Sequence, residues 1–111
     1  MIFKINNNTW EILEKSKEIL LNKYNQESND DATYAFGVCI YPDHEIWINK
    51  DMNTEQKIKT LKHELTHCFI WNYGLYNVPH FTEEMVCDIV SSINDFINEI
   101  VEKYKKVIDN G

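Results

Sequence analysis

The sequence predicts a small α+β domain in which three helices pack on a small antiparallel sheet or hairpin. Three stretches repeat their apolar residues with a helical period, and a stretch between the first two alternates large apolar with smaller residues at a period of two. With 111 residues the chain has room for one hydrophobic core, because two cores would each be marginal in size. We therefore treat residues 1–111 as a single domain.

The first helix is predicted over residues 9–24. Asn8 is a suitable N-cap, and Glu11 stands three residues later, as in a capping box. The apolar stripe of this helix would consist of Trp10, Leu13, Leu20 and Tyr24, with Ile12 and Ile19 alongside. Residues 26–31 are polar and short-chained and predict a loop.

A β-hairpin is predicted over residues 33–49. The apolar members of its alternating pattern are Tyr34, Phe36, Val38 and Ile40. Pro42 suits a type I turn over residues 41–44, after which residues 45–49 resume the β-branched and aromatic pattern. Residues 1–5 are a candidate extra strand.

Two further helices are predicted, from Asn53 to Tyr73 and from about residue 82 to about residue 108. Asn53 and Gln56 have capping-box spacing, and Gly74 is placed to end the second helix. The third helix follows Pro79. Its stripe would consist of Val86, Val90, Ile93, Ile97, Ile100 and Tyr104.

The composition argues against several classes of function. Eighteen acidic residues against eleven lysines and no arginine give a net charge of -7, which disfavours direct nucleic-acid binding. No apolar run has the roughly 18 residues of a membrane span, and the first residues lack the apolar core of a signal peptide. Cys39, Cys68 and Cys87 form no disulfide framework. We expect a protein of the bacterial or host-cell cytoplasm, without a membrane partner.

The pattern His-Glu-Leu-Thr-His occupies residues 63–67, inside the second predicted helix. Residues four apart share a helix face, so His63 and His67 can bind one metal ion. Zn²⁺ accepts neutral imidazole at about 2.0–2.1 Å, and Glu64 can act as general base toward an attacking water. A separate, apolar face consists of Ile58, Leu61, Leu65 and Cys68. The helix is therefore expected to join a core to a metal cleft.

Catalytic zinc normally takes three protein ligands, so a third must come from elsewhere in the chain. Glu84 is the predicted third ligand, because Asp88 lies four residues later and can accept a hydrogen bond from a ligand imidazole. His80 and Tyr73 are candidates to donate a hydrogen bond to the oxyanion.

Residues 60–67, Thr-Leu-Lys-His-Glu-Leu-Thr-His, and the later pattern Glu84-x-x-Cys87-Asp88-x-Val90-Ser91 resemble the ImmA/IrrE family of small zinc metallopeptidases. The similarity covers roughly residues 32–93 and is greatest to the short versions carried by phages and mobile elements. It implies a minimal zincin-like fold of gluzincin type, with His63, His67 and Glu84 as zinc ligands and Glu64 as base. Cys87 and Val90 depart from the Ala and Phe of the family pattern. A lesser resemblance, to SprT-like proteins, would make His80 the third ligand.

These patterns together predict a zinc-dependent endopeptidase. Larger members of the ImmA/IrrE family cleave repressor or regulator proteins, so the resemblance implies a protein substrate such as a transcriptional repressor. We expect an extended substrate beside the strand at residues 45–49. The alternative is a non-catalytic interaction protein of phage or mobile-element origin, which uses the same fold to bind a host protein.

Overall fold

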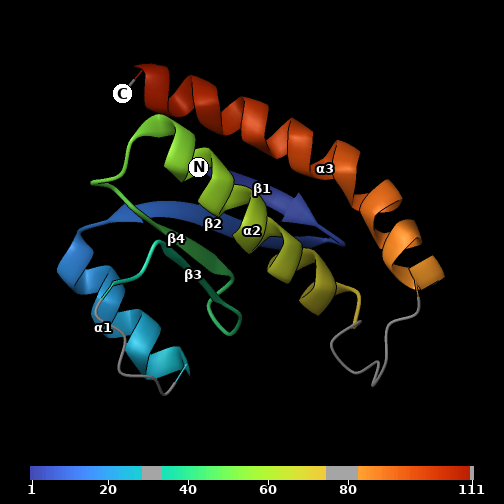
Figure 1. Ribbon diagram of the computed structural model, residues 1–111, viewed down its shortest axis with the longest axis horizontal. Coiled ribbons are helices and arrows are strands. Elements are labelled where there is room, and N and C mark those ends of the chain that lie inside the picture. The colour runs from blue at the N-terminus through green and yellow to red at the C-terminus, as the bar shows by residue number, and fades with distance from the viewer. Residues whose placement is uncertain (29–33, 75–82, 111) are drawn as a thin grey trace.

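The computed structural model describes residues 1–28, 34–74 and 83–110 of the chain (Figure 1). In order, its elements are β1 (Ile2–Ile5), β2 (Asn8–Lys15), α1 (Lys17–Ser28), β3 (Gly37–Ile40), β4 (Glu45–Asn49), α2 (Thr54–Asn72) and α3 (Glu83–Asn110). The predicted α+β class is confirmed, with three helices and a four-stranded sheet in this part of the chain. Among the described helices, none has the length and apolar character needed to cross a membrane.

The sheet is mixed, whereas the sequence predicted an antiparallel one. Its strand order is β1-β2-β4-β3. β1 pairs with β2 and β3 with β4 in antiparallel fashion, but β2 and β4 run parallel. Between β2 and β4 the chain passes through α1 and β3. β4 therefore enters the sheet beside β2 and runs in the same direction. As a result, β4 is an interior strand, and β3 is an edge strand among the described elements.

The predicted first helix is wrong over its first half, because residues 8–15 form β2. Trp10 pairs with Phe3 of β1, and Ile12 pairs with Ile46 of β4. Both side chains are buried by these pairings, which outweigh the local helix signals. The missed signal is the turn before β2, where Asn6 and Asn7 have φ of 49° and 67°. Two consecutive residues with positive φ are typical of the type I′ turn of a tight hairpin.

The second and third predicted helices are confirmed. The side chain of Asn53 caps α2 by accepting a hydrogen bond of 2.8 Å from the Gln56 amide. Gly74, with φ of 72°, follows the end of the helix. In α3 the stripe residues Ile93, Ile100 and Tyr104 are buried. Val90 was assigned to the same stripe, but it is exposed.

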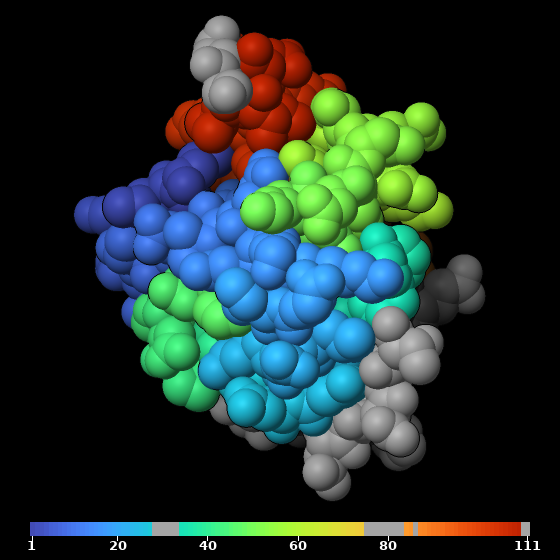
Figure 2. All heavy atoms as spheres, turned by 90° about the vertical axis from the view of Figure 1, so that its left-hand side faces the viewer, coloured from blue at the N-terminus to red at the C-terminus, as the bar shows by residue number. Residues whose placement is uncertain are grey.

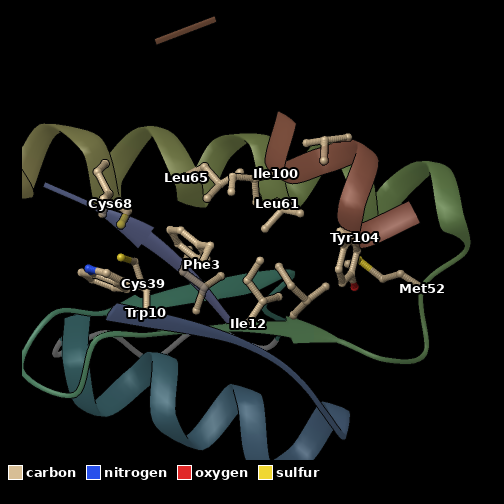
Figure 3. Packing of buried hydrophobic residues seen from close by; sticks show 14 residues of the cluster. Phe3, Trp10, Ile12, Cys39, Met52, Leu61, Leu65, Cys68, Ile100 and Tyr104 are labelled. Carbon is tan, nitrogen blue, oxygen red and sulfur yellow. The ribbon is translucent and has the colours of Figure 1, made fainter. Parts of the chain in front are cut away.

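Helices cover both faces of the sheet (Figure 1). α2 and α3 enclose the main core, in which Cys68 of α2 and Cys39 of β3 point toward each other (Figure 3). α1 covers the opposite face through Leu20, which packs with Val38 and Ile40. Figure 2 shows the molecule from the side that lies at the left of Figure 1. In this view the last turns of α3 and the helix α1 are at opposite ends, with β2 and the start of α2 between them. The core thus fixes α2 against the sheet.

Candidate active site

α2 carries the His-Glu-x-x-His motif to the β3 edge of the sheet. Leu61, Leu65 and Cys68 of the predicted apolar face are fully buried in the main core (Figure 3). This packing sets the rotation of the helix, so that His63 and His67 are exposed. Glu64 is turned inward, and only 7% of its surface is accessible.

The two histidines form a close pair. Their Nε2 atoms are 3.1 Å apart, and the rings meet nearly edge to face, with centroids 4.8 Å apart. Two nitrogens bound tetrahedrally to one Zn²⁺ ion would lie about 3.3 Å apart. Desolvation, followed by the neighbouring His63, lowers the pKa of His67. Because a metal binds neutral imidazole, this shift favours ligation, and the pair fits two corners of a zinc site.

Burial raises the pKa of Glu64 to about 7. Its surroundings include Tyr41, whose pKa rises to about 12, mainly through burial. Burial also raises the pKa of Cys39, and the nearby Cys68 and Glu64 add to that shift. Cys39 and Tyr41 are thus uncharged near neutral pH, whereas Glu64 is poised to take up and release a proton, as a general base requires.

Gly37 allows β3 to approach α2 closely at this point. A Cβ atom on Gly37 would lie 2.7 Å from Cγ2 of Thr60, 3.0 Å from the carbonyl oxygen of Trp47 and 3.4 Å from Cγ of Glu64. Only glycine therefore fits here without displacing the strand or the helix. In the alternating sequence pattern, Gly37 counted only as one of the small residues. A glycine inside a strand was the available signal, because it often marks a close backbone approach.

A cleft runs along β3 on either side of the motif. It consists of two hollows of about 610 and 360 Å³ that share Tyr24, Gly37, His63 and Glu64. The larger hollow extends past Tyr34 and Phe36, and the smaller one extends past Tyr41 and His67. The exposed aromatic residues of the larger hollow, like Tyr41, were not among the site residues predicted from the sequence.

The other predicted site residues that the structure describes do not join the histidine pair. Glu84 and Asp88 are exposed near the start of α3. Across residues 1–28, 34–74 and 83–110, no three His, Cys, Asp or Glu side chains are grouped so that they could hold a metal ion. His80 lies outside the described residues. Tyr73 packs against Phe69 and lines neither hollow, whereas Tyr41 lines the smaller hollow with Glu64 and is better placed than Tyr73 to face an oxyanion.

No family model, curated protein or solved structure matches the chain. The resemblance to ImmA/IrrE and SprT-like proteins therefore stays a prediction, carried by the motifs at residues 60–67 and 84–91.

The backbone of β3 offers hydrogen bonds to an extended ligand. Bonded and non-bonded residue pairs alternate in an antiparallel ladder. The Asn49 amide donates to the Phe36 carbonyl at 2.9 Å, so the next pair, Gly37 with Ile48, is a non-bonded one. The N–H and C=O groups of Gly37, and by the same alternation those of Cys39, point away from β4. The predicted substrate position beside residues 45–49 is wrong, because β4 is already paired on both sides.

Proposed function

We propose that this protein is a zinc-dependent endopeptidase that hydrolyses a peptide bond within an extended segment of a protein substrate. The observation that carries the proposal is the pair of His63 and His67 Nε2 atoms 3.1 Å apart, beside the buried Glu64 and the outer edge of β3, which pairs with no further strand among the described elements. If His63 and His67 were only solvated residues of a surface helix, no buried carboxyl group would be needed between them. The combination of ligand pair, base and peptide-binding edge favours peptide hydrolysis.

His63 and His67 would hold the ion together with a third ligand, either Glu84 or His80. When bound, zinc would supply a Lewis acid and lower the pKa of water at its open coordination position. Glu64 would take the proton from the attacking water and transfer it to the leaving amine, a cycle that suits a pKa of about 7. The protonated phenol of Tyr41 lines the same cleft and could donate a hydrogen bond to the oxyanion.

The outward backbone groups of Gly37 and Cys39 would hold the substrate as an added strand. Such main-chain pairing suits an unfolded or extended segment of a protein, and a transcriptional repressor is the substrate class that we propose. Cys39, Cys68 and Cys87 are free, as is usual in the reducing cytoplasm, which is the compartment that we propose.

The test is to compare wild type with Glu64→Gln after both have been loaded with zinc. The amide preserves shape and cannot accept the proton, so we expect cleavage of an unfolded protein such as casein to fall about 10²–10⁴-fold while zinc content is unchanged. Mass spectrometry of the fragments and elemental analysis give the two readouts. A zinc chelator should abolish the wild-type activity.

Two results would contradict the proposal. A change of less than threefold in Glu64→Gln would show that Glu64 is not the base. If wild type cleaves neither casein nor a candidate repressor, yet both proteins bind that repressor equally, the alternative of a non-catalytic interaction protein is favoured.

A further inference from the structure

The larger hollow of the cleft carries an exposed pair of aromatic residues at the start of β3. Tyr34 is 42% exposed and Phe36 is 53% exposed, and their ring centroids lie 4.9 Å apart at 71°. Large apolar side chains in contact with each other and with solvent are typical of binding surfaces. The pair lies beside His63 and Glu64, which line the same hollow.

Contacts with a buried asparagine and a lysine hold the aromatic pair in place. Asn49 is fully buried, and its side-chain amide donates to the Tyr34 hydroxyl at 3.2 Å and to the Ala35 carbonyl at 3.3 Å. Its Oδ1 atom accepts a hydrogen bond of 2.9 Å from the Asp51 amide. On another side of Tyr34, the Lys17 ammonium lies 5.5 Å from the ring centroid. These contacts order the segment before β3, so less ordering is needed when a ligand binds.

Lys59 of α2 lines the same hollow. It is exposed, and within the described residues it has no carboxylate partner, in contrast to Lys57, whose Nζ is 2.9 Å from Glu14. The whole chain has a net charge of -7. An unpaired cation beside the cleft of an acidic protein would attract a carboxylate on the ligand.

A strand added to β3 would present its side chains to the two rims in alternation. Val38 and Ile40 pack on the α1 side, whereas Cys39 belongs to the core beneath α2. Lys17 of α1 lies over the Tyr34 ring and Phe36 packs on Tyr34, so the aromatic pair is on the α1 side, whereas Lys59 belongs to α2. Because neighbouring residues of a strand point to opposite faces, consecutive side chains of a bound peptide would meet the aromatic pair and Lys59.

We infer that the preferred substrate segment carries a large apolar side chain directly adjacent to an acidic one. Tyr34 and Phe36 bind the apolar side chain, and Lys59 binds the carboxylate. This inference rests on the proposed function, because it specifies the substrate of the same cleft. Exposed aromatic area gives affinity for the first side chain, and charge complementarity selects the second.

The probes are internally quenched decapeptides of Ser, Thr and Gly in which one residue pair is moved through every position. Phe-Glu and Glu-Phe are compared with Phe-Lys and Ala-Glu, with kcat/KM read from fluorescence. Lys59→Glu tests the charge, and Phe36→Ala tests the aromatic pair. Lys106→Glu and Ile2→Ala are the matched controls, because both residues are exposed and line neither hollow.

We expect peptides with Phe beside Glu to be cleaved fastest. Lys59→Glu should reduce this rate about fivefold and raise the rate for Phe-Lys by a similar factor, as an exposed ion pair allows. Phe36→Ala should slow the three Phe-containing peptides about tenfold and leave Ala-Glu unchanged. Neither control variant should alter the preference.

Equal cleavage of all peptides by wild type, or an unchanged preference in Lys59→Glu, would overturn the inference and leave the peptidase proposal intact. If neither these peptides nor casein is cleaved, the peptidase proposal fails, and binding of the same peptides is then measured by fluorescence anisotropy. Tighter binding of Phe-Glu that Lys59→Glu weakens would support the inference on its own. Absence of such binding would overturn it.

Discussion

Glu64 and the two histidines that flank it are close in the helix and yet occupy different environments. The imidazoles are exposed and lie close to each other, while the Glu64 side chain is buried with its Cγ atom next to Gly37. The difference follows from helical geometry. Glu64 comes directly after His63 and is therefore rotated by about 100° around the helix axis, so that it points at β3. A single turn of helix therefore carries both the proposed zinc ligands and a carboxyl group with a raised pKa.

The first prediction at this scale concerns the third zinc ligand. We expect about one zinc ion per chain, and loss of that ion in His63→Ala or His67→Ala, because the two imidazoles bind together. Glu84→Ala should weaken zinc binding more than His80→Ala, and Asp88→Ala should weaken it about 10–100-fold. Competition titration with a chromophoric chelator measures each affinity.

Asp95→Ala is the matched control, because Asp95 is an exposed carboxylate farther along α3. A reversed ranking of Glu84 and His80 would favour the SprT-like ligand set. Wild type that is folded and binds no zinc would rule out the metal site altogether.

At the scale of the elements, β3 and α2 form the site through one close contact. A Cβ atom added to Gly37 would lie 2.7 Å from Thr60 Cγ2, which is shorter than van der Waals contact. Gly37→Ala should therefore destabilise the protein by about 1–3 kcal/mol and lower the proposed peptidase activity, because β3 must separate from Thr60 and thus from the helix that carries Glu64. Urea unfolding and the casein assay measure the two effects.

The control for this prediction removes the opposing methyl group. Thr60→Ser deletes Cγ2, so the double variant Gly37→Ala with Thr60→Ser should recover part of the lost stability. The approach to the Trp47 carbonyl at 3.0 Å is unchanged, and recovery should therefore be incomplete. A Gly37→Ala variant as stable and active as wild type would contradict the close-contact argument.

The elements differ in how well the sequence predicted them. α2 was predicted because its cap, its period and its terminating glycine agree, and the structure contains each of them. β2 was not, because Trp10 and Ile12 suit a helix stripe as well as a strand, and only pairing with β1 and β4 decides between them. The edge position of β3 depends on the same pairing. Local signals thus predicted the motif helix, whereas the edge position of β3 could be known only from the tertiary arrangement.

At the scale of the whole molecule, Glu14 connects three elements that are distant in sequence. It belongs to β2, and its carboxylate accepts a hydrogen bond of 2.8 Å from the Tyr104 hydroxyl of α3 and one of 2.9 Å from Lys57 of α2. Tyr104 is buried, and burial followed by the bond to Glu14 raises its pKa. The phenol is therefore protonated at neutral pH and remains a donor. This junction fixes the C-terminal part of α3 to the sheet.

Tyr104→Phe should lower the free energy of unfolding by about 1 kcal/mol, because it removes a hydrogen bond to a charged group and keeps the packing of the ring. For a domain of this size the melting temperature should fall by roughly 4–8 °C, measured by circular dichroism. Tyr73→Phe is the matched control and should leave stability unchanged, since Tyr73 is half-exposed at the end of α2. Zinc affinity and cleavage should be unaffected in folded Tyr104→Phe, because this junction lies outside the cleft. An unchanged melting temperature would show that Glu14 does not stabilise the packing of α3.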